Sequence, residues 1–144
     1  IVDSLVGSEM CIRDSYKGIL CIEFFIDNND NILVNEIAPR THNSGHYSIE
    51  GCNISQFEHQ VKILTDKEPA NSTLTSSSVM LNLLGDLWAK GNPDFTNTNE
   101  KNIYLHLYNK NKAKNGRKMG HITIIGDTLI SSNNKAEELF KKLN

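Results

Sequence analysis

Two short apolar segments on either side of a polar turn constrain the fold of this chain more than any other feature. Residues 19–26 and 32–38 are rich in residues favoured in strands, and residues 27–31 between them are all Asp or Asn. Such a pair of segments predicts a β-hairpin. Pro39 disfavours helical geometry at the residue before it, so we expect the second strand to end at Ala38.

Each of the two apolar segments contains one glutamate, Glu23 in the first and Glu36 in the second. A four-residue loop pairs Asp27 with Ile32 and so places the two glutamates directly opposite each other. Like charges in this position repel, and a carboxylate in an apolar setting is costly unless it is paired or bound to a metal. A divalent cation such as Mg²⁺ or Mn²⁺ would turn the repulsion into a binding site. Two alternatives stay open: the face is simply exposed to solvent, or a one-residue slip pairs Glu23 with Asn35 and moves Glu36 to the other face.

A capping box marks the start of a helix in the middle of the chain. Ser55 is followed three residues later by Glu58, and Phe57, Val61 and Leu64 then recur at helical spacing. This pattern predicts an amphipathic helix that begins after Ser55.

The rest of the chain predicts antiparallel strands and one further helix. We expect strands at residues 79–84, 103–108 and 118–125, an irregular segment at 90–102, and a final helix at 136–143 capped by Asn133 or Asn134. The predicted fold class is α+β, with antiparallel pairs dominant.

The segment after Pro39 carries several groups that bind anions or metals. Arg40 is suited to bidentate recognition of phosphate or carboxylate. His42 and His46 have a spacing that binds a metal only on a helix, which Gly45 disfavours. The alternative is an ordinary polar surface loop.

A second basic segment surrounds an Asn-Gly turn near the C-terminus, with cations at Lys110, Lys112, Lys114, Arg117 and Lys118. It is either the solvated tip of a hairpin or a binding site for a phosphate group. Because the whole chain has a net charge of −2 and few aromatic residues accompany the basic ones, we expect no nucleic-acid partner.

Composition also bears on the cellular compartment. No apolar run approaches the ~18 residues that span a bilayer, so we expect no membrane partner. The three cysteines are an odd number without paired spacing, which favours a reducing, cytoplasmic environment. Cys21 has no neighbouring base in the sequence and therefore reads as structural.

The first fifteen residues differ in character from the rest. The chain begins with Ile rather than Met, and residues 1–15 (IVDSLVGSEMCIRDS) resemble translated sequencing-adapter DNA. We therefore expect this segment to be non-native and leave it out of the functional argument. The alternative is an ordinary N-terminal loop.

Four segments taken together resemble one enzyme family. GILCIEFFID, NILVNEIAPRTHNSGH, VMLNLLGD and NGRKMGHITIIG, in this order, are similar to the C-terminal portion of the 5-(carboxyamino)imidazole ribonucleotide synthases, ATP-grasp carboxylases of purine biosynthesis. The resemblance implies that residues 16–85 are the second half of an ATP-grasp domain. It implies that residues 86–144 are a small β-rich domain with a terminal helix.

The resemblance also implies an activity and its residues. Family members use ATP to activate bicarbonate as carboxyphosphate, which then carboxylates the amine of aminoimidazole ribonucleotide. The residues that match the family's catalytic positions are Glu23, Glu36 and Arg40, with Glu23 and Glu36 as ligands of Mg²⁺ (or Mn²⁺). Those that match its nucleotide contacts are Asn35 and Glu36. Those that match its substrate contacts are Arg40, His42, Asn43, Lys110 and Arg117.

Three hypotheses follow from the sequence. The first is that the chain is part of such a ligase, inactive alone, whose full-length form is a homodimer. The second is a free-standing module that binds Mg²⁺ or phosphate. The third is a subunit completed by a separate N-terminal chain.

Overall fold

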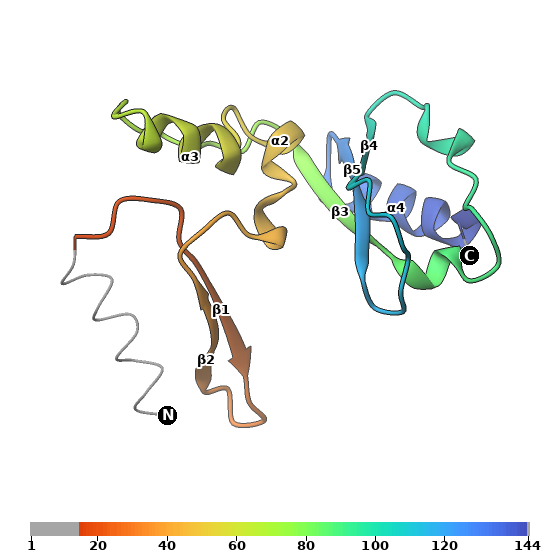
Figure 1. The fold of residues 1–144 in the computed structure, drawn as a ribbon, viewed down its shortest axis with the longest axis horizontal. Helices are drawn as coiled ribbons and strands as arrows, with labels where there is room; N and C mark the ends of the chain where they lie inside the picture. Colours follow the sequence, from red (N-terminus) through yellow and green to blue (C-terminus); the bar gives the residue numbers. More distant parts are fainter. Residues whose placement is uncertain (1–14, 144) are drawn as a thin grey trace. The chain divides into compact units, whose positions relative to one another are not determined.

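The computed structural model describes residues 15–143, which form two units (Figure 1). The first unit contains the residues up to 46 together with residues 54–72, and the second contains residues 47–53 and those from 73 onward. Residues 1–14 of the segment expected to be non-native lie outside the described residues, and only its last residue, Ser15, is described. No helix in residues 15–143 is long and apolar enough to cross a bilayer.

The predicted hairpin is present in the first unit. Strand β1, Cys21–Ile26, pairs antiparallel with β2, Ile32–Ala38, and the two form a sheet of two strands. The carboxylate of Asp27 fixes the turn between them, because it accepts hydrogen bonds from the backbone N–H groups of Asn29 and Asn31 and from the Asn31 side chain. These hydrogen bonds, that of the Asn31 side chain foremost, lower the pKa of Asp27.

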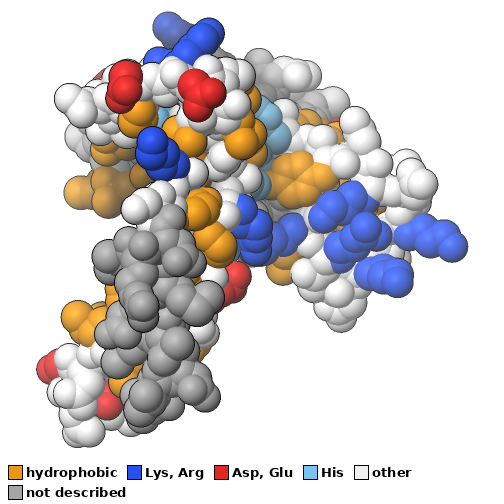
Figure 2. All heavy atoms as spheres, turned by 60° about the vertical axis from the view of Figure 1, so that its left-hand side comes forward, with side chains coloured by type: hydrophobic (Ala, Val, Ile, Leu, Met, Phe, Trp, Pro, Cys, Tyr) orange, Lys and Arg blue, Asp and Glu red, His pale blue; other side chains and the backbone are white. Residues whose placement is uncertain are grey.

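Helix α3, Gln56–Leu64, begins with the predicted capping box. The hydroxyl of Ser55 accepts from the backbone N–H of Glu58, and the Glu58 carboxylate accepts from the backbone N–H of Ser55. The apolar stripe is present but is not buried by the described residues, since Val61 and Leu64 are 59% and 73% exposed. Hydrophobic side chains are visible at the surface in Figure 2.

Replacing Ser55 by Ala should lower the free energy of unfolding by about 1 kcal/mol, because the N-cap hydroxyl satisfies an otherwise unpaired backbone N–H. Urea unfolding measures this loss, and Ser55→Asp, which restores a side-chain acceptor, is the control. The hydrogen bonds from Ser55 also lower the pKa of Glu58, so its contribution is present at neutral pH and is lost as the pH falls through that lowered value. An Ala variant as stable as the unaltered chain would show that the cap contributes nothing.

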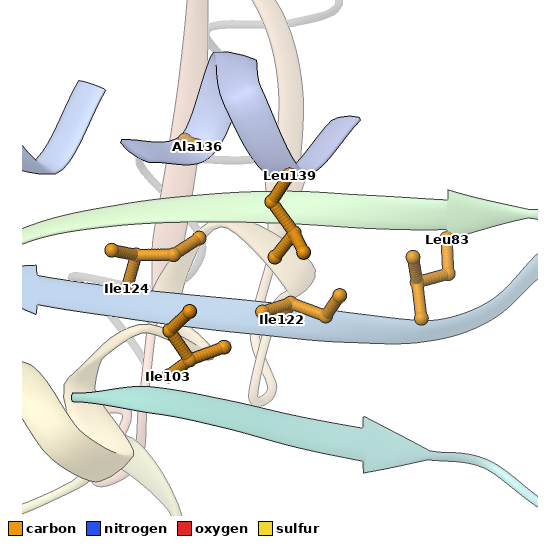
Figure 3. Packing of buried hydrophobic residues seen from close by; sticks show 6 residues of the cluster. All are labelled: Leu83, Ile103, Ile122, Ile124, Ala136 and Leu139. Carbon is orange, nitrogen blue, oxygen red and sulfur yellow. The ribbon is translucent and has the colours of Figure 1, made fainter. Parts of the chain in front are cut away.

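The second unit is built around a sheet of three antiparallel strands. Its order is β3 (Ser77–Leu84), β5 (Lys118–Gly126) and β4 (Ile103–Leu107). Helix α4, Leu129–Leu143, packs on one face of this sheet. The core between them, shown in Figure 3, consists of Leu83, Ile103, Ile122, Ile124, Ala136 and Leu139. The short helix α2, Ser48–Gly51, contacts β3 and β5.

Two boundaries differ from those expected. The final helix was predicted to begin at residue 136, capped by Asn133 or Asn134, and this is wrong: α4 begins at Leu129. Thr128 and Ser131 exchange reciprocal hydrogen bonds at its start, and Asn133 lies inside the helix, where its side chain donates to Glu137. The division expected at residue 85 also differs from the two units, because β3 pairs with β5 and thereby belongs to the second unit.

The α+β class with antiparallel pairing is confirmed.

Candidate functional site

Glu23 and Glu36 lie directly opposite each other in the hairpin, as the sequence predicted. The turn expected between them is wrong in detail, because Ile26 rather than Asp27 pairs with Ile32 and the turn has one residue more. The register shifts back between Glu23 and Phe24, where Asn35 is the extra residue of a β-bulge. The bulge thus compensates for the longer turn and keeps Glu23 and Glu36 opposite each other.

The side chain of Asn35, the extra residue of the bulge, contacts Glu23. Its side-chain amide donates to Oε2 of Glu23 over 3.3 Å. The side chains of Glu23 and Glu36 are 38% and 48% exposed, so their oxygens are accessible from solvent. Two opposed carboxylates and an amide form an oxygen-rich set, which is what Mg²⁺ and Mn²⁺ prefer.

The segment after β2 supplies a guanidinium and an imidazole beside these carboxylates. Nη2 of Arg40 lies 3.6 Å from Oε1 of Glu36, and Nε2 of His42 lies 3.5 Å from Oε1 of Glu23. Arg40 is exposed, whereas the His42 side chain is only 12% exposed. Three of the predicted site residues, Asn35, Arg40 and His42, therefore gather around the glutamate pair.

Gln56, at the start of α3, holds His42 in place and was missed by sequence reasoning. Its side chain accepts from the backbone N–H of His42 and donates to the His42 carbonyl, over 2.9 and 2.8 Å. Gln56 is buried and its amide nitrogen also lies 2.7 Å from Nδ1 of His46. A glutamine inside a capping box carries no sequence signal for this role. Asn43, the remaining predicted residue of this segment, begins the 3₁₀ turn Asn43–Gly45.

His42 and His46 do not share a metal site among the described residues. His46 turns toward Gln56 and stacks at a tilt on Phe57, with 5.2 Å between ring centroids. The cluster that does form joins His42 with Glu23 and Cys21, whose ligand atoms all lie within 4.8 Å of one another. Cys21, read as structural from the sequence, therefore has an imidazole and a carboxylate close by.

The basic segment forms the loop between β4 and β5. Nζ of Lys110 donates to the carbonyl of Lys118 over 2.6 Å and lies 5.3 Å from the centre of the Tyr108 ring. The Arg117 guanidinium donates to the carbonyl of Lys112 over 3.0 Å. Asp86 anchors the turn, since its carboxylate accepts from the backbone N–H of Gly116. Figure 2 shows Lys and Arg side chains gathered on the surface of the molecule. Arg40 belongs to the first unit and these cations to the second.

Two family models match the chain. The ATP-grasp domain model matches residues 9–57, and the model of the phosphoribosylaminoimidazole carboxylase C-terminal domain matches residues 78–135. The first match includes residues 9–15, within the segment expected to be non-native. The second begins in β3, before the division expected at residue 85.

Curated relatives show which enzyme family combines these two domains in this chain. An N5-carboxyaminoimidazole ribonucleotide synthase of Staphylococcus saprophyticus is 41% identical over 127 residues, which are 88% of this chain and 33% of the relative. That of Staphylococcus aureus strain COL is 47% identical over 76% of this chain and 29% of its own length. This chain is part of the N5-carboxyaminoimidazole ribonucleotide synthase family. It spans about a third of the length of these curated relatives.

Solved structures of N5-carboxyaminoimidazole ribonucleotide synthases agree with this assignment. The Thermotoga maritima enzyme is 33% identical with a TM-score of 0.78, over 97% of this chain and 40% of that structure. The Aspergillus clavatus enzyme, in complex with ADP and 5-aminoimidazole ribonucleotide, is 36% identical with a TM-score of 0.73, over 88% of this chain and 35% of that structure.

Proposed function

We propose that this chain is the part of an ATP-dependent ligase that carboxylates 5-aminoimidazole ribonucleotide with bicarbonate. The observation that carries the proposal is the Glu23–Glu36 pair, which the bulge at Asn35 keeps opposed in a family that binds ADP and ATP. In this reaction the γ-phosphoryl group of ATP passes to bicarbonate, giving carboxyphosphate and ADP. The amine of the ribonucleotide then attacks the carboxyl carbon, and phosphate leaves.

Each residue has a role set by its chemistry. Glu23 and Glu36 hold Mg²⁺ (or Mn²⁺), which when bound neutralises charge on the nucleotide phosphates. Asn35 contacts the nucleotide through its amide. Arg40, His42 and Asn43 contact the reacting substrates, and Arg40 stabilises negative charge that develops in the reaction.

The ribonucleotide phosphate is bound by Lys110 and Arg117. A phosphate dianion needs several cationic donors, and the loop between β4 and β5 carries them. We place the full-length enzyme in the cytoplasm, consistent with the odd number of cysteines in this chain, and propose a homodimer from the family resemblance.

A hybrid enzyme tests this function directly. Residues 16–144 replace the matching third of the Staphylococcus saprophyticus relative, and ADP release is measured with ATP, Mg²⁺, bicarbonate and the ribonucleotide. We expect ADP release that rises on addition of both bicarbonate and the ribonucleotide. A folded hybrid that the ribonucleotide does not stimulate would contradict the proposal.

In this hybrid, Arg117→Ala should raise the KM for the ribonucleotide at least about tenfold, because a hydrogen bond to a charged group contributes about 1.5–3 kcal/mol. The KM for ATP should change less than about twofold, since the lost contact is to the other substrate. Lys114→Ala, in the same loop, is the matched control. Equal increases in both KM values would refute the assignment of Arg117.

A further inference from the structure

Cys21, Glu23 and His42 form a cluster with the composition of a transition-metal site. One potential ligand atom from each lies within 4.8 Å of the other two. Cys21 and Glu23 stand two residues apart on β1, so their side chains emerge on the same face of the hairpin. His42 approaches them from the segment after β2, and all three residues are partly buried.

The distance between His42 and Glu23 matches that between two ligands of one metal ion. Nε2 of His42 and Oε1 of Glu23 are 3.5 Å apart, which is long for a hydrogen bond. Zinc bonds of about 2.0–2.2 Å to nitrogen and oxygen, at a tetrahedral angle, place the two ligand atoms ~3.4 Å apart. The observed separation therefore leaves room for the ion between them.

Ser44 links His42 to Cys21. Its hydroxyl oxygen lies 2.8 Å from Nδ1 of His42 and 3.5 Å from Sγ of Cys21. With Nε2 bound to a metal, Nδ1 carries the ring proton and donates to Ser44, whose own hydroxyl then donates to the cysteine sulfur. Such partners orient metal-binding histidines in known sites. The backbone N–H of Ser44, 3.3 Å from Nδ1, suits the opposite tautomer in the metal-free protein.

We propose that Cys21, Glu23 and His42 bind Zn²⁺ through a thiolate, a carboxylate and an imidazole, with a fourth position open to water. On binding, the thiol of Cys21 releases its proton to solvent. Thiolate and imidazole ligands select zinc over magnesium. Because Glu23 also belongs to the proposed Mg²⁺ pair, zinc withdraws this carboxylate and competes with the Mg²⁺-nucleotide. This consequence rests on the proposed function, whereas zinc binding does not.

Cobalt spectroscopy of the 144-residue chain tests the site, with Co²⁺ as the probe for zinc. The background variant carries Cys11→Ser and Cys52→Ser, so that Cys21 is its one thiol. We expect Co²⁺ to produce a thiolate-to-cobalt charge-transfer band that saturates at one ion per chain. Zn²⁺ should abolish the band, and Mg²⁺ at the same concentration should leave it unchanged.

Four further variants test the thiolate and imidazole ligands and their surroundings. Cys21→Ser should abolish the band, and His42→Ala should weaken Co²⁺ binding by more than about a hundredfold. Ser44→Ala keeps every ligand and should weaken binding about 10–100-fold, as loss of an orienting partner does. Glu36→Gln is the matched control on the opposite strand and should leave the Co²⁺ affinity unchanged, although it disrupts the proposed Mg²⁺ pair.

Two outcomes would overturn the zinc site. One is the absence of a thiolate band in the background variant. The other is a band whose Co²⁺ affinity survives His42→Ala, or is the same in urea, since either shows a lone thiol binding the ion. Neither result bears on ADP release by the hybrid enzyme, so failure of the zinc site and failure of the proposed function remain distinguishable.

Discussion

Glu36→Gln in the hybrid enzyme is expected to lower kcat about a thousandfold, while the free energy of unfolding stays within about 0.5 kcal/mol. A metal ion on phosphoryl oxygens supplies several kcal/mol of charge stabilisation, and the amide removes one of its two charged ligands. Folding is spared because Glu36 is exposed and its loss relieves repulsion from the opposed Glu23.

ADP release and urea unfolding of the same preparations measure the two quantities. Glu68→Gln, an exposed glutamate in the segment after α3, is the matched control and should leave both unchanged. Parallel losses of activity and stability in the Glu36 variant would show a structural role instead.

The 144-residue chain alone is expected to show no ATP-dependent carboxylation. It spans about a third of the length of its curated relatives. In the proposed function, Glu23 and Glu36 would supply only one set of the contacts that the nucleotide needs. Orientation of reacting groups supplies roughly 7–11 kcal/mol of barrier reduction, at ~1.4 kcal/mol per tenfold in rate. Loss of most of this effect places the rate below detection.

The measurement is ADP release by the purified chain with ATP, Mg²⁺, bicarbonate and the ribonucleotide. The same chain with Glu36→Gln sets the background. Turnover by the unaltered chain above that background would show that its own residues suffice for catalysis.

The glutamate pair illustrates what the sequence can and cannot predict. The expected register placed Glu23 opposite Glu36 on the basis of a four-residue turn that is in fact one residue longer. The two apolar segments and the polar turn between them made the hairpin itself predictable. The bulge at Asn35 was not, because the choice between a longer turn and a bulge depends on local hydrogen bonds such as those of Asp27.

Contacts between distant residues were the least predictable part of the site. Gln56 binds the backbone of His42 across 14 positions, and Cys21 meets His42 only because the hairpin folds back. Neither residue lies in a local motif with the other. The start of α4 was missed for a different reason, since the Thr128–Ser131 cap precedes any apolar periodicity that the final helix displays.

The hairpin has a consequence for the behaviour of the isolated chain. In the described residues β1 and β2 form a sheet of two strands, so each strand has an outer edge that no third strand covers. The strands also carry exposed apolar side chains, such as Phe25 and Ile26, which are 58% and 72% exposed. Uncovered edges of this kind template strand addition and aggregation. Self-association of the isolated chain would therefore result from these unpaired strand edges and would not indicate how the full-length enzyme assembles.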